Sequence, residues 1–294
     1  DLVHLILFNR GLHVRRKSDG NYHVPTNMVY ELINPPDKLK DYVRNFWLLE
    51  FDLGPSEKNL RLHADSFPRL TFQYLDRRSH IRNKDGTQLP QFYLRGIMTA
   101  PVEAFIHGRY AHVAVSFFPH ALERIFGVKG FDVIDRTCDL SDICPPELLS
   151  KLTEATSGHQ RISLLSDFFT FQLQKKFKDD AFIRQCILAS PASFDWNINS
   201  LIHSHQISER QLERKFRSAI GISPKTYLRI SRFEKAVRLL QGRRFDKLSG
   251  VATDLGYADH SHFTRDFKSS AGLTPQAYLG ARRLIEYGGS FLRG

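Results

Sequence analysis

The stretch SERQLERKFRSAIGISPKTYL, residues 208–228, recurs as DHSHFTRDFKSSAGLTPQAYL, residues 259–279, when the sequence is shifted by 51 positions. Seven of the 21 aligned positions are identical: an arginine, a phenylalanine, a serine, a glycine, a proline and a final Tyr-Leu pair. Identity at this many positions with one offset indicates two copies of a single supersecondary unit.

Each copy carries the chemistry of a capped helix. Ser208, with Gln211 three residues later, forms a capping-box pattern, and Asp259 is the N-cap residue of the second copy. Gly221 and Gly272 follow at equivalent positions, where a glycine ends a helix. We therefore expect one helix in each copy, running from its cap to its glycine.

Both helices are amphipathic in the same phase. In the first copy the inward stripe is apolar, and it contains Leu212, Phe216, Ala219 and Ile220. The opposite stripe is charged, and it contains Arg210, Glu213, Arg214 and Arg217. The second copy buries Phe263 and Phe267 and presents Ser261, Thr264, Arg265 and Lys268. Short helices expected over 198–203 and 248–255 precede the two copies, so each unit has the helix-turn-helix layout, whose second helix enters a DNA major groove.

One longer helix is expected between the units. Ser223 caps it, Pro224 lies in its first turn and Gly242 ends it. About 18 residues at 1.5 Å each give a helix of about 27 Å, close to one turn of B-DNA. Two units joined by such a helix could reach successive major grooves on one side of a duplex.

The last ~105 residues resemble the AraC/XylS family of bacterial transcription regulators, which carry two helix-turn-helix units joined by a linker helix. The segment GYADHSHFTRDFKSSAGLTPQAYL, residues 256–279, follows the family pattern of Gly, an aromatic, Ser-x-Phe-x-Arg-x-Phe-Lys and Gly-x-x-Pro-x-x-Tyr. The linker segment YLRISRFEKAVRLL, residues 227–240, also fits the family. One departure is Gly250, which stands in a stretch that is usually rich in isoleucine and costs ~1 kcal/mol of helix stability against alanine.

The resemblance implies double-stranded DNA as a partner, and RNA polymerase as a second one. It places Arg210, Glu213 and Arg214 at base-facing positions of the first recognition helix, and Ser261, His262 and Arg265 at those of the second. The predicted DNA-binding set is completed by residues on the same stripes, namely Thr264, Arg217 and Lys268. We expect Arg217 and Lys268, nearer the helix ends, to contact phosphates rather than bases.

The N-terminal part has a different periodicity. Alternating apolar residues near 70–74 and 111–117, separated by turn clusters, predict short antiparallel strands that form a barrel or a sandwich. Helices are expected over 120–126 and 162–177, the second with an apolar stripe that could pack on its own domain or form a dimer face. The sensor halves of the resembling regulators suggest a small cupin-like barrel.

The predicted fold class is α+β, with residues 1–178 as a sensor or dimerisation domain, 179–284 as an AraC-type DNA-binding domain and 285–294 as a tail.

The barrel could hold a small-molecule effector. Leu70, Phe72, Tyr74, Val113, Val115 and Phe117 share one strand parity and are expected to line a common interior that either packs solidly or holds an apolar ligand. The residues predicted to contact an effector are Arg61, His63, Phe72, Tyr74, Arg95 and His107. The chain could also form a homodimer. The alternative stays open that the N-terminal domain only dimerises or binds a protein partner, without a ligand.

Composition agrees with this division. The chain of 294 residues carries a net charge of +11. Residues 179–294 hold 18 basic and 11 acidic residues, against 24 and 20 in the longer N-terminal part, an asymmetry expected of a domain that meets a polyanion. No run of about 18 apolar residues exists to span a membrane, and LVHLILF, residues 2–8, is more typical of a buried strand than of a signal peptide. Three cysteines favour a reducing cytoplasm.

Other functional classes find little support in the sequence. The pairs His203/His205 and His260/His262 are two residues apart, so they do not converge on a metal within a helix. Cys138 and Cys144 lack a CxxC pattern, which argues against a metal-dependent alkyl-accepting repair enzyme. Arg78 and Arg82 could clamp a phosphate, but a solvated hairpin tip is the favoured interpretation. We expect a regulator without a cofactor or metal. An enzyme with an appended DNA-binding domain is the least supported alternative, because no catalytic motif occurs.

Overall fold

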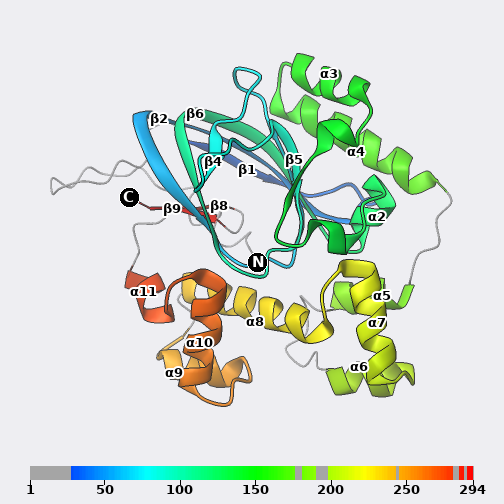
Figure 1. Cartoon of the computed structure of the whole chain (residues 1–294), viewed down its shortest axis with the longest axis vertical. Helices are drawn as coiled ribbons and strands as arrows, with labels where there is room; N and C mark the ends of the chain where they lie inside the picture. Colours follow the sequence, from blue (N-terminus) through cyan, green and yellow to red (C-terminus); the bar gives the residue numbers. More distant parts are fainter. Residues whose placement is uncertain are drawn as a thin grey trace.

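The computed structural model describes residues 28–175, 181–189, 198–242, 245–280, 285–287 and 290–293. Its N-terminal part is an antiparallel sheet that curls into a barrel (Figure 1). The strands of this part are β1 (Val29–Ile33), β2 (Val43–Leu62), β3 (Arg69–Gln73), β4 (Ile81–Asn83), β5 (Phe92–Arg95), β6 (Val102–Phe117) and β7 (Thr137–Asp139). The predicted strand 2–8 lies outside the described residues.

Two long strands form the frame of the barrel. β2 has 20 residues and β6 has 16, and they pair along nearly their whole length. Their register shifts between Asp52 and Glu57, where Gly54 adopts φ +59°. β3 pairs with the second half of β6 and β4 with its first half, so the sheet bends around one long strand. The strands predicted near 70–74 and 111–117 are confirmed as β3 and the end of β6.

Both faces of this sheet are buried, by different partners. One face carries Leu70, Phe72, Val113, Val115 and Phe117, the set of one parity that the alternation predicts. This face packs solidly against helices rather than enclosing a cavity. The other face turns toward the inside of the barrel, and its residues form a separate cluster around Trp47, Phe51, Tyr93, Ile106 and Tyr110.

Three helices cover the outer face of the sheet (Figure 1). They are α2 (Ala121–Phe126), α3 (Pro146–Glu154) and α4 (Gly158–Gln174). Gly127 ends α2 in the left-handed conformation, directly after the predicted helix range 120–126. α4 begins earlier than the predicted residue 162, because Ser157 accepts a hydrogen bond from the backbone of Gln160 as its N-cap, and it ends before 177. Its apolar stripe, Ile162, Leu165 and Phe169, is buried in the same core, so the stripe serves its own domain.

The C-terminal part is helical. Its helices are α5 (Ala181–Ala189), α6 (Ile198–His205), α7 (Glu209–Ile220), α8 (Pro224–Gln241), α9 (Leu248–Asp254), α10 (His260–Ala271) and α11 (Pro275–Gly280). α6 and α7 form one helix-turn-helix unit and α9 and α10 the other, at opposite ends of α8 (Figure 1). The predicted fold class is confirmed: an antiparallel β domain is followed by a helical domain.

The two parts share buried contacts. Ala64 and Ile97, from the barrel, belong to the same core cluster as Phe216, Phe233 and Phe267 of the helices. The C-terminal residues also return to the barrel, because β8 (Ile285–Tyr287) and β9 (Ser290–Arg293) form a hairpin whose second strand pairs with β2. The helices of the C-terminal part therefore pack directly against the barrel.

Candidate functional site

The two recognition helices are built as their sequences predict. Ser208 and Gln211 form a complete capping box at the start of α7. Asp259 accepts a 2.7 Å hydrogen bond from the backbone of His262 at the start of α10. Gly221 and Gly272 end the helices with φ of +84° and +73°, the left-handed conformation in which glycine is favoured. Each helix thus has fixed ends and presents a defined outer face.

The outer face of α7 is exposed and basic. Leu212, Phe216 and Ile220 are fully buried, while Arg210, Arg214 and Arg217 are exposed and Glu213 is half-buried. Arg217 Nε lies 2.7 Å from Glu213 Oε1, so these two side chains pair with each other. Among the described residues Arg214 makes no hydrogen bond or ion pair, which leaves its guanidinium available to an outside partner.

α10 repeats this arrangement. Phe263 and Phe267 are buried, Ser261, Arg265 and Lys268 are exposed, and His262 and Thr264 are half-buried. Arg265 forms no ion pair or direct hydrogen bond within the described part of the chain. The pKa of Asp259 is lowered mainly by the hydrogen bond from the His262 backbone, and Arg265 lowers it further. Eight of the nine predicted DNA-contact residues therefore lie on the exposed or half-buried outer sides of the two helices, whereas the hydroxyl of Thr264 is buried and is not presented to an outside partner.

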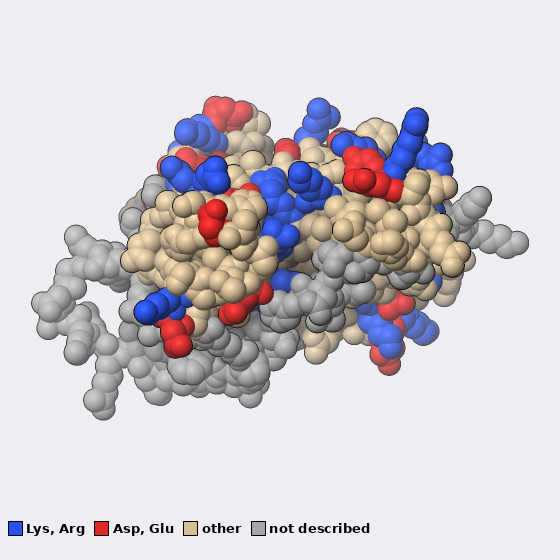
Figure 2. All heavy atoms as spheres, turned by 90° about the horizontal axis from the view of Figure 1, so that it is seen from below, with Lys and Arg blue, Asp and Glu red and all other residues tan. Residues whose placement is uncertain are grey.

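The helix between the two units adds positive charge. α8 carries five Lys and Arg residues against one acid, Glu234. Seen from below, Lys and Arg side chains gather in the depression between the two helix-turn-helix lobes (Figure 2). The sequence analysis did not single out α8 as a source of charge, although its composition contains the signal.

The barrel domain holds α8 and both recognition helices. Glu234 of α8 accepts hydrogen bonds from the backbone N (2.6 Å) and the hydroxyl (2.7 Å) of Ser66. The backbone of Ala64 donates to the carbonyl of Ser270 at the end of α10, at 2.8 Å. At the end of α7, a Cβ on Gly221 would lie 2.5 Å from the backbone of Phe131, so this turn packs tightly on the barrel domain.

The barrel contains a cavity of about 780 Å³, open solvent at its mouth included. Of the predicted effector residues, only His63 and Arg95 line it. Phe72 and Tyr74 belong to the core under the helices, because they have the opposite strand parity. Arg61 pairs with Glu103, and His107 is exposed, with its ring 5.8 Å from that of His80. Four of the six predicted residues therefore lie away from the cavity.

Polar residues line one wall of the cavity. Arg69 and Arg95 stand directly opposite each other in β3 and β5, and both line the cavity. Arg69 pairs with Asp65, which is the only carboxylate among the described residues that line the cavity. Burial lowers the pKa of Arg95, and its guanidinium lies 5.8 Å from the Tyr93 ring. Sequence analysis could not find Asp65 or Arg69, because the cross-strand register places them.

A second polar group of the cavity is a chain of three side chains. Trp47 Nε1 lies 2.9 Å from His112 Nε2, and His112 Nδ1 lies 2.6 Å from the Tyr110 hydroxyl. Burial, with a smaller effect of Arg69, lowers the pKa of His112 to about 3, so the ring is neutral. Burial also raises the pKa of Tyr110 well above its ordinary value, so the phenol keeps its proton.

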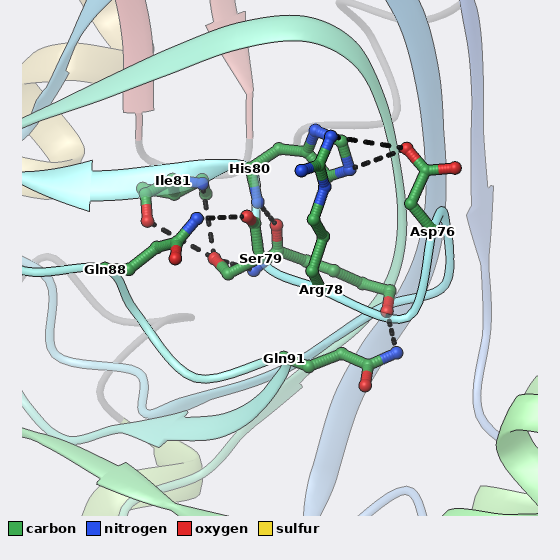
Figure 3. Close-up of polar contacts among 8 residues, drawn as sticks. Asp76, Arg78, Ser79, His80, Ile81, Gln88 and Gln91 are labelled. Atoms are coloured by element: carbon green, nitrogen blue, oxygen red, sulfur yellow. Dashed lines mark hydrogen bonds and ion pairs between the residues drawn. The ribbon is translucent and has the colours of Figure 1, made fainter.

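The arginines proposed as a phosphate clamp are already paired. Arg82 makes two hydrogen bonds to the Glu57 carboxylate, at 2.9 and 2.7 Å. Arg78 and His80 both face Asp76 (Figure 3), with His80 Nε2 3.5 Å from its Oδ2. The segment is solvated only at residues 76–78, since Ser79, His80 and Ile81 between the two arginines are buried in a polar network of their own.

No group of three or more His, Cys, Asp or Glu side chains that could hold a metal occurs among the described residues. Cys138 and Cys144 are free thiols. None of the helices that the structure describes is long and apolar enough to cross a membrane.

Two family models match the chain. One, described as a helix-turn-helix domain, covers residues 203–281. The other, described as a domain of unknown function (DUF6597), covers residues 31–139. These two ranges correspond to the helical part and to the barrel.

Curated relatives of this chain include two regulators of transcription. The HTH-type transcriptional regulator MtrA of Neisseria gonorrhoeae is 31% identical over 84 residues, which are 29% of this chain and 28% of the relative. The HTH-type transcriptional activator RhaR of Yersinia pseudotuberculosis serotype O:3 is 34% identical over 83 residues, 28% of each chain. This chain thus spans less than a third of the length of either relative.

Among solved structures, a similar chain is the unsaturated fatty acid-bound wild-type ToxT from Vibrio cholerae strain SCE256. It has a TM-score of 0.42 and 12% identity, and the match covers 88% of this chain and 97% of ToxT. The C-terminal domain of AraT, a response regulator from Geobacillus stearothermophilus, is 26% identical with a TM-score of 0.33, over 37% of this chain and 91% of that domain.

Proposed function

We propose that this chain, whose C-terminal domain belongs to the AraC type of helix-turn-helix domains, is a regulator of transcription that binds specific DNA sequences. The observation that carries the proposal is the pair of capped helices α7 and α10. Each exposes an arginine, Arg214 or Arg265, that makes no ion pair among the described residues. An arginine on a recognition helix can donate two hydrogen bonds to O6 and N7 of guanine, the commonest specific contact in the major groove.

The linker helix supports binding to two successive major grooves. α8 has 18 residues, and at 1.5 Å per residue it spans about 27 Å, near the spacing of adjacent major grooves on one side of B-DNA. The Lys and Arg side chains that gather between the two lobes (Figure 2) would lie near the phosphates between the grooves. RNA polymerase as a second partner, a homodimer and a cytoplasmic location remain parts of the proposal, as does the division of the chain near residue 178.

We further propose that a small molecule in the barrel cavity controls DNA binding. The support is the position of the segment 64–67. Asp65 lines the cavity and pairs with Arg69, while its neighbour Ser66 donates both hydrogen bonds to Glu234 of α8. A ligand that moved Asp65 would therefore disturb the anchor of the linker helix.

Selection of binding sites from a random pool of duplexes tests the proposal. The full chain should enrich one sequence with two half-sites about 10 base pairs apart, read in the major groove. The selected duplex should then bind at least 10³-fold tighter than a scrambled duplex of equal composition at the same salt concentration. Equal affinity for the two duplexes would refute sequence-specific binding.

A further inference from the structure

The cavity wall formed by β3 and β5 holds more positive than negative charge. Arg69 and Arg95 are direct cross-strand partners on the same face of the sheet, an arrangement that is unfavourable for two like charges. Asp65 pairs with Arg69 and is the single carboxylate of the lining, while His112 is neutral. One positive charge, that of Arg95, is therefore left without a carboxylate in this wall.

The Trp47–His112–Tyr110 chain adds a second donor to the same cavity. An indole N–H can only donate, so His112 Nε2 is the acceptor of the 2.9 Å bond from Trp47. A neutral ring with an acceptor at Nε2 carries its proton on Nδ1, and Nδ1 must donate to the Tyr110 oxygen 2.6 Å away. The hydroxyl proton of Tyr110 is then free for another acceptor, and the described residues supply none. Tyr110 lines the cavity, so its proton serves an acceptor there.

The rest of the lining is largely apolar. Leu60 and Leu62 from β2, Ile81 from β4, and Ile106 from β6 contribute to the cavity away from the β3–β5 wall. A sugar would find too few hydrogen-bond partners against these side chains, since every polar group buried without a partner costs free energy. A dianion would bring one charge more than Arg95 can balance.

We propose that the barrel cavity binds a monocarboxylate with an apolar body, its carboxylate held by Arg95 and by the hydroxyl of Tyr110. The apolar body lies against the leucines and isoleucines of β2, β4 and β6. A charged hydrogen bond in such an enclosed site is strong because both partners have already left water. The inference rests on the proposed function only where it makes this acid the effector of a DNA-binding regulator.

Isothermal titration calorimetry on the full chain tests the inference with two matched pairs of probes. These are 4-phenylbutanoate against 4-phenylbutanamide, and octanoate against octanamide. The members of a pair share their apolar body and their carbonyl oxygen and differ in charge. At least one carboxylate should bind tenfold or more tightly than its amide, a difference of about 1.4 kcal/mol.

Three variants locate the effect. Arg95→Gln should reduce the preference for the carboxylate to less than threefold, because the amide does not need the charge. Tyr110→Phe should weaken the carboxylate and the amide alike, since both accept a hydrogen bond. Arg109→Gln is the matched control: Arg109 is exposed, precedes Tyr110 in β6 and pairs with Glu50 at 2.5 Å, so the preference should be unchanged.

The inference is overturned if neither carboxylate binds at 1 mM, if the amides bind as tightly, or if Arg109→Gln removes the preference as Arg95→Gln does. Thermal unfolding of each variant shows whether it is folded, and the wild-type preference decides the question if Arg95→Gln is not. DNA binding is measured on the same samples. A carboxylate preference without DNA binding would overturn the proposed function alone, and specific DNA binding without the preference would overturn this inference alone.

Discussion

Replacing Arg214 with alanine is expected to weaken binding to the selected duplex and to leave scrambled DNA nearly unaffected. In the free protein Arg214 is exposed and forms no ion pair or hydrogen bond with the described residues, so its removal costs the fold little. The lost energy is therefore that of the contact with DNA. A bidentate contact with guanine contributes about 1–3 kcal/mol, which corresponds to a loss of roughly 5- to 150-fold in affinity.

Arg217 provides the matched control on the same helix. Its guanidinium is paired with Glu213 at 2.7 Å, and an exposed pair at this spacing stabilises a helix by only about 0.3–0.5 kcal/mol. Near the end of α7, Arg217 is expected to contact a phosphate. Arg217→Ala should then weaken both duplexes equally and lower the slope of log K against log salt by about one.

Fluorescence anisotropy with labelled duplexes measures both effects. Titrations of the selected and the scrambled duplex at several salt concentrations separate the loss of specific contacts from the loss of charge, and urea unfolding verifies the stability of each variant. If Arg214→Ala weakened both duplexes equally, Arg214 would be a phosphate contact and the assignment of base recognition to this position would be wrong.

Three further predictions concern stability. Lowering the pH from about 7 to about 5 should reduce the free energy of unfolding by about 2 kcal/mol through His112. Its pKa of about 3 in the folded protein lies below the 6.5 of the free side chain, so only the unfolded state takes up the proton in this range. In urea unfolding, His112→Gln should show a pH dependence that is smaller by this amount. Gly250→Ala should raise the free energy of unfolding by up to ~1 kcal/mol, since no atom lies within 4 Å of the added Cβ in α9, and a lower melting temperature would contradict this. At pH 7, Glu234→Gln should have a melting temperature no lower than that of the wild type, because burial and then Asp65 raise the pKa of Glu234 and make its charge unfavourable. Glu234→Ala should have a clearly lower melting temperature, because it loses the two hydrogen bonds from Ser66, which are worth about 1–3 kcal/mol. Equal melting of these two variants would show that the bonds contribute nothing.

The two helix-turn-helix units and the helix between them could be predicted because their signals are local, whereas α5 and α11 were not predicted. Ser208, Asp259, Gly221 and Gly272 fix helix ends through bonds that reach only three or four residues along the chain. The repeat then supplies the second unit from the first. The exposed face of each recognition helix follows from the 3.6-residue period, so the candidate DNA contacts were within reach of the sequence as well.

The cavity could not be predicted, because alternating apolar residues identify a strand but do not show which of its faces lies inside the barrel and which lies under the helices. In β6 every residue from Tyr110 to Phe117 is buried, one parity under the helices and the other inside the barrel. Phe72 and Tyr74 were assigned to the effector site on the assumption of a single buried face, and the cavity belongs to the other parity. The pairing of Arg69 with Arg95 depends on a register between distant segments, which no local pattern encodes.

The short segment 64–67 is the place where a signal from the cavity would have to leave the barrel. Ala64 bonds to the end of α10, Asp65 faces the cavity, and Ser66 holds Glu234 of the linker helix, so three consecutive residues touch one recognition helix, the candidate effector and α8. A carboxylate at Arg95 lies beside Arg69 and therefore competes with Asp65 for positive charge. Because Asp65 is covalently joined to Ala64 and Ser66, the proposed function predicts that a shift of Asp65 would disturb the hydrogen bonds of its two neighbours. Under the proposed function, a ligand in the barrel would therefore act on DNA binding through the contacts of this segment with α10 and with the linker helix α8.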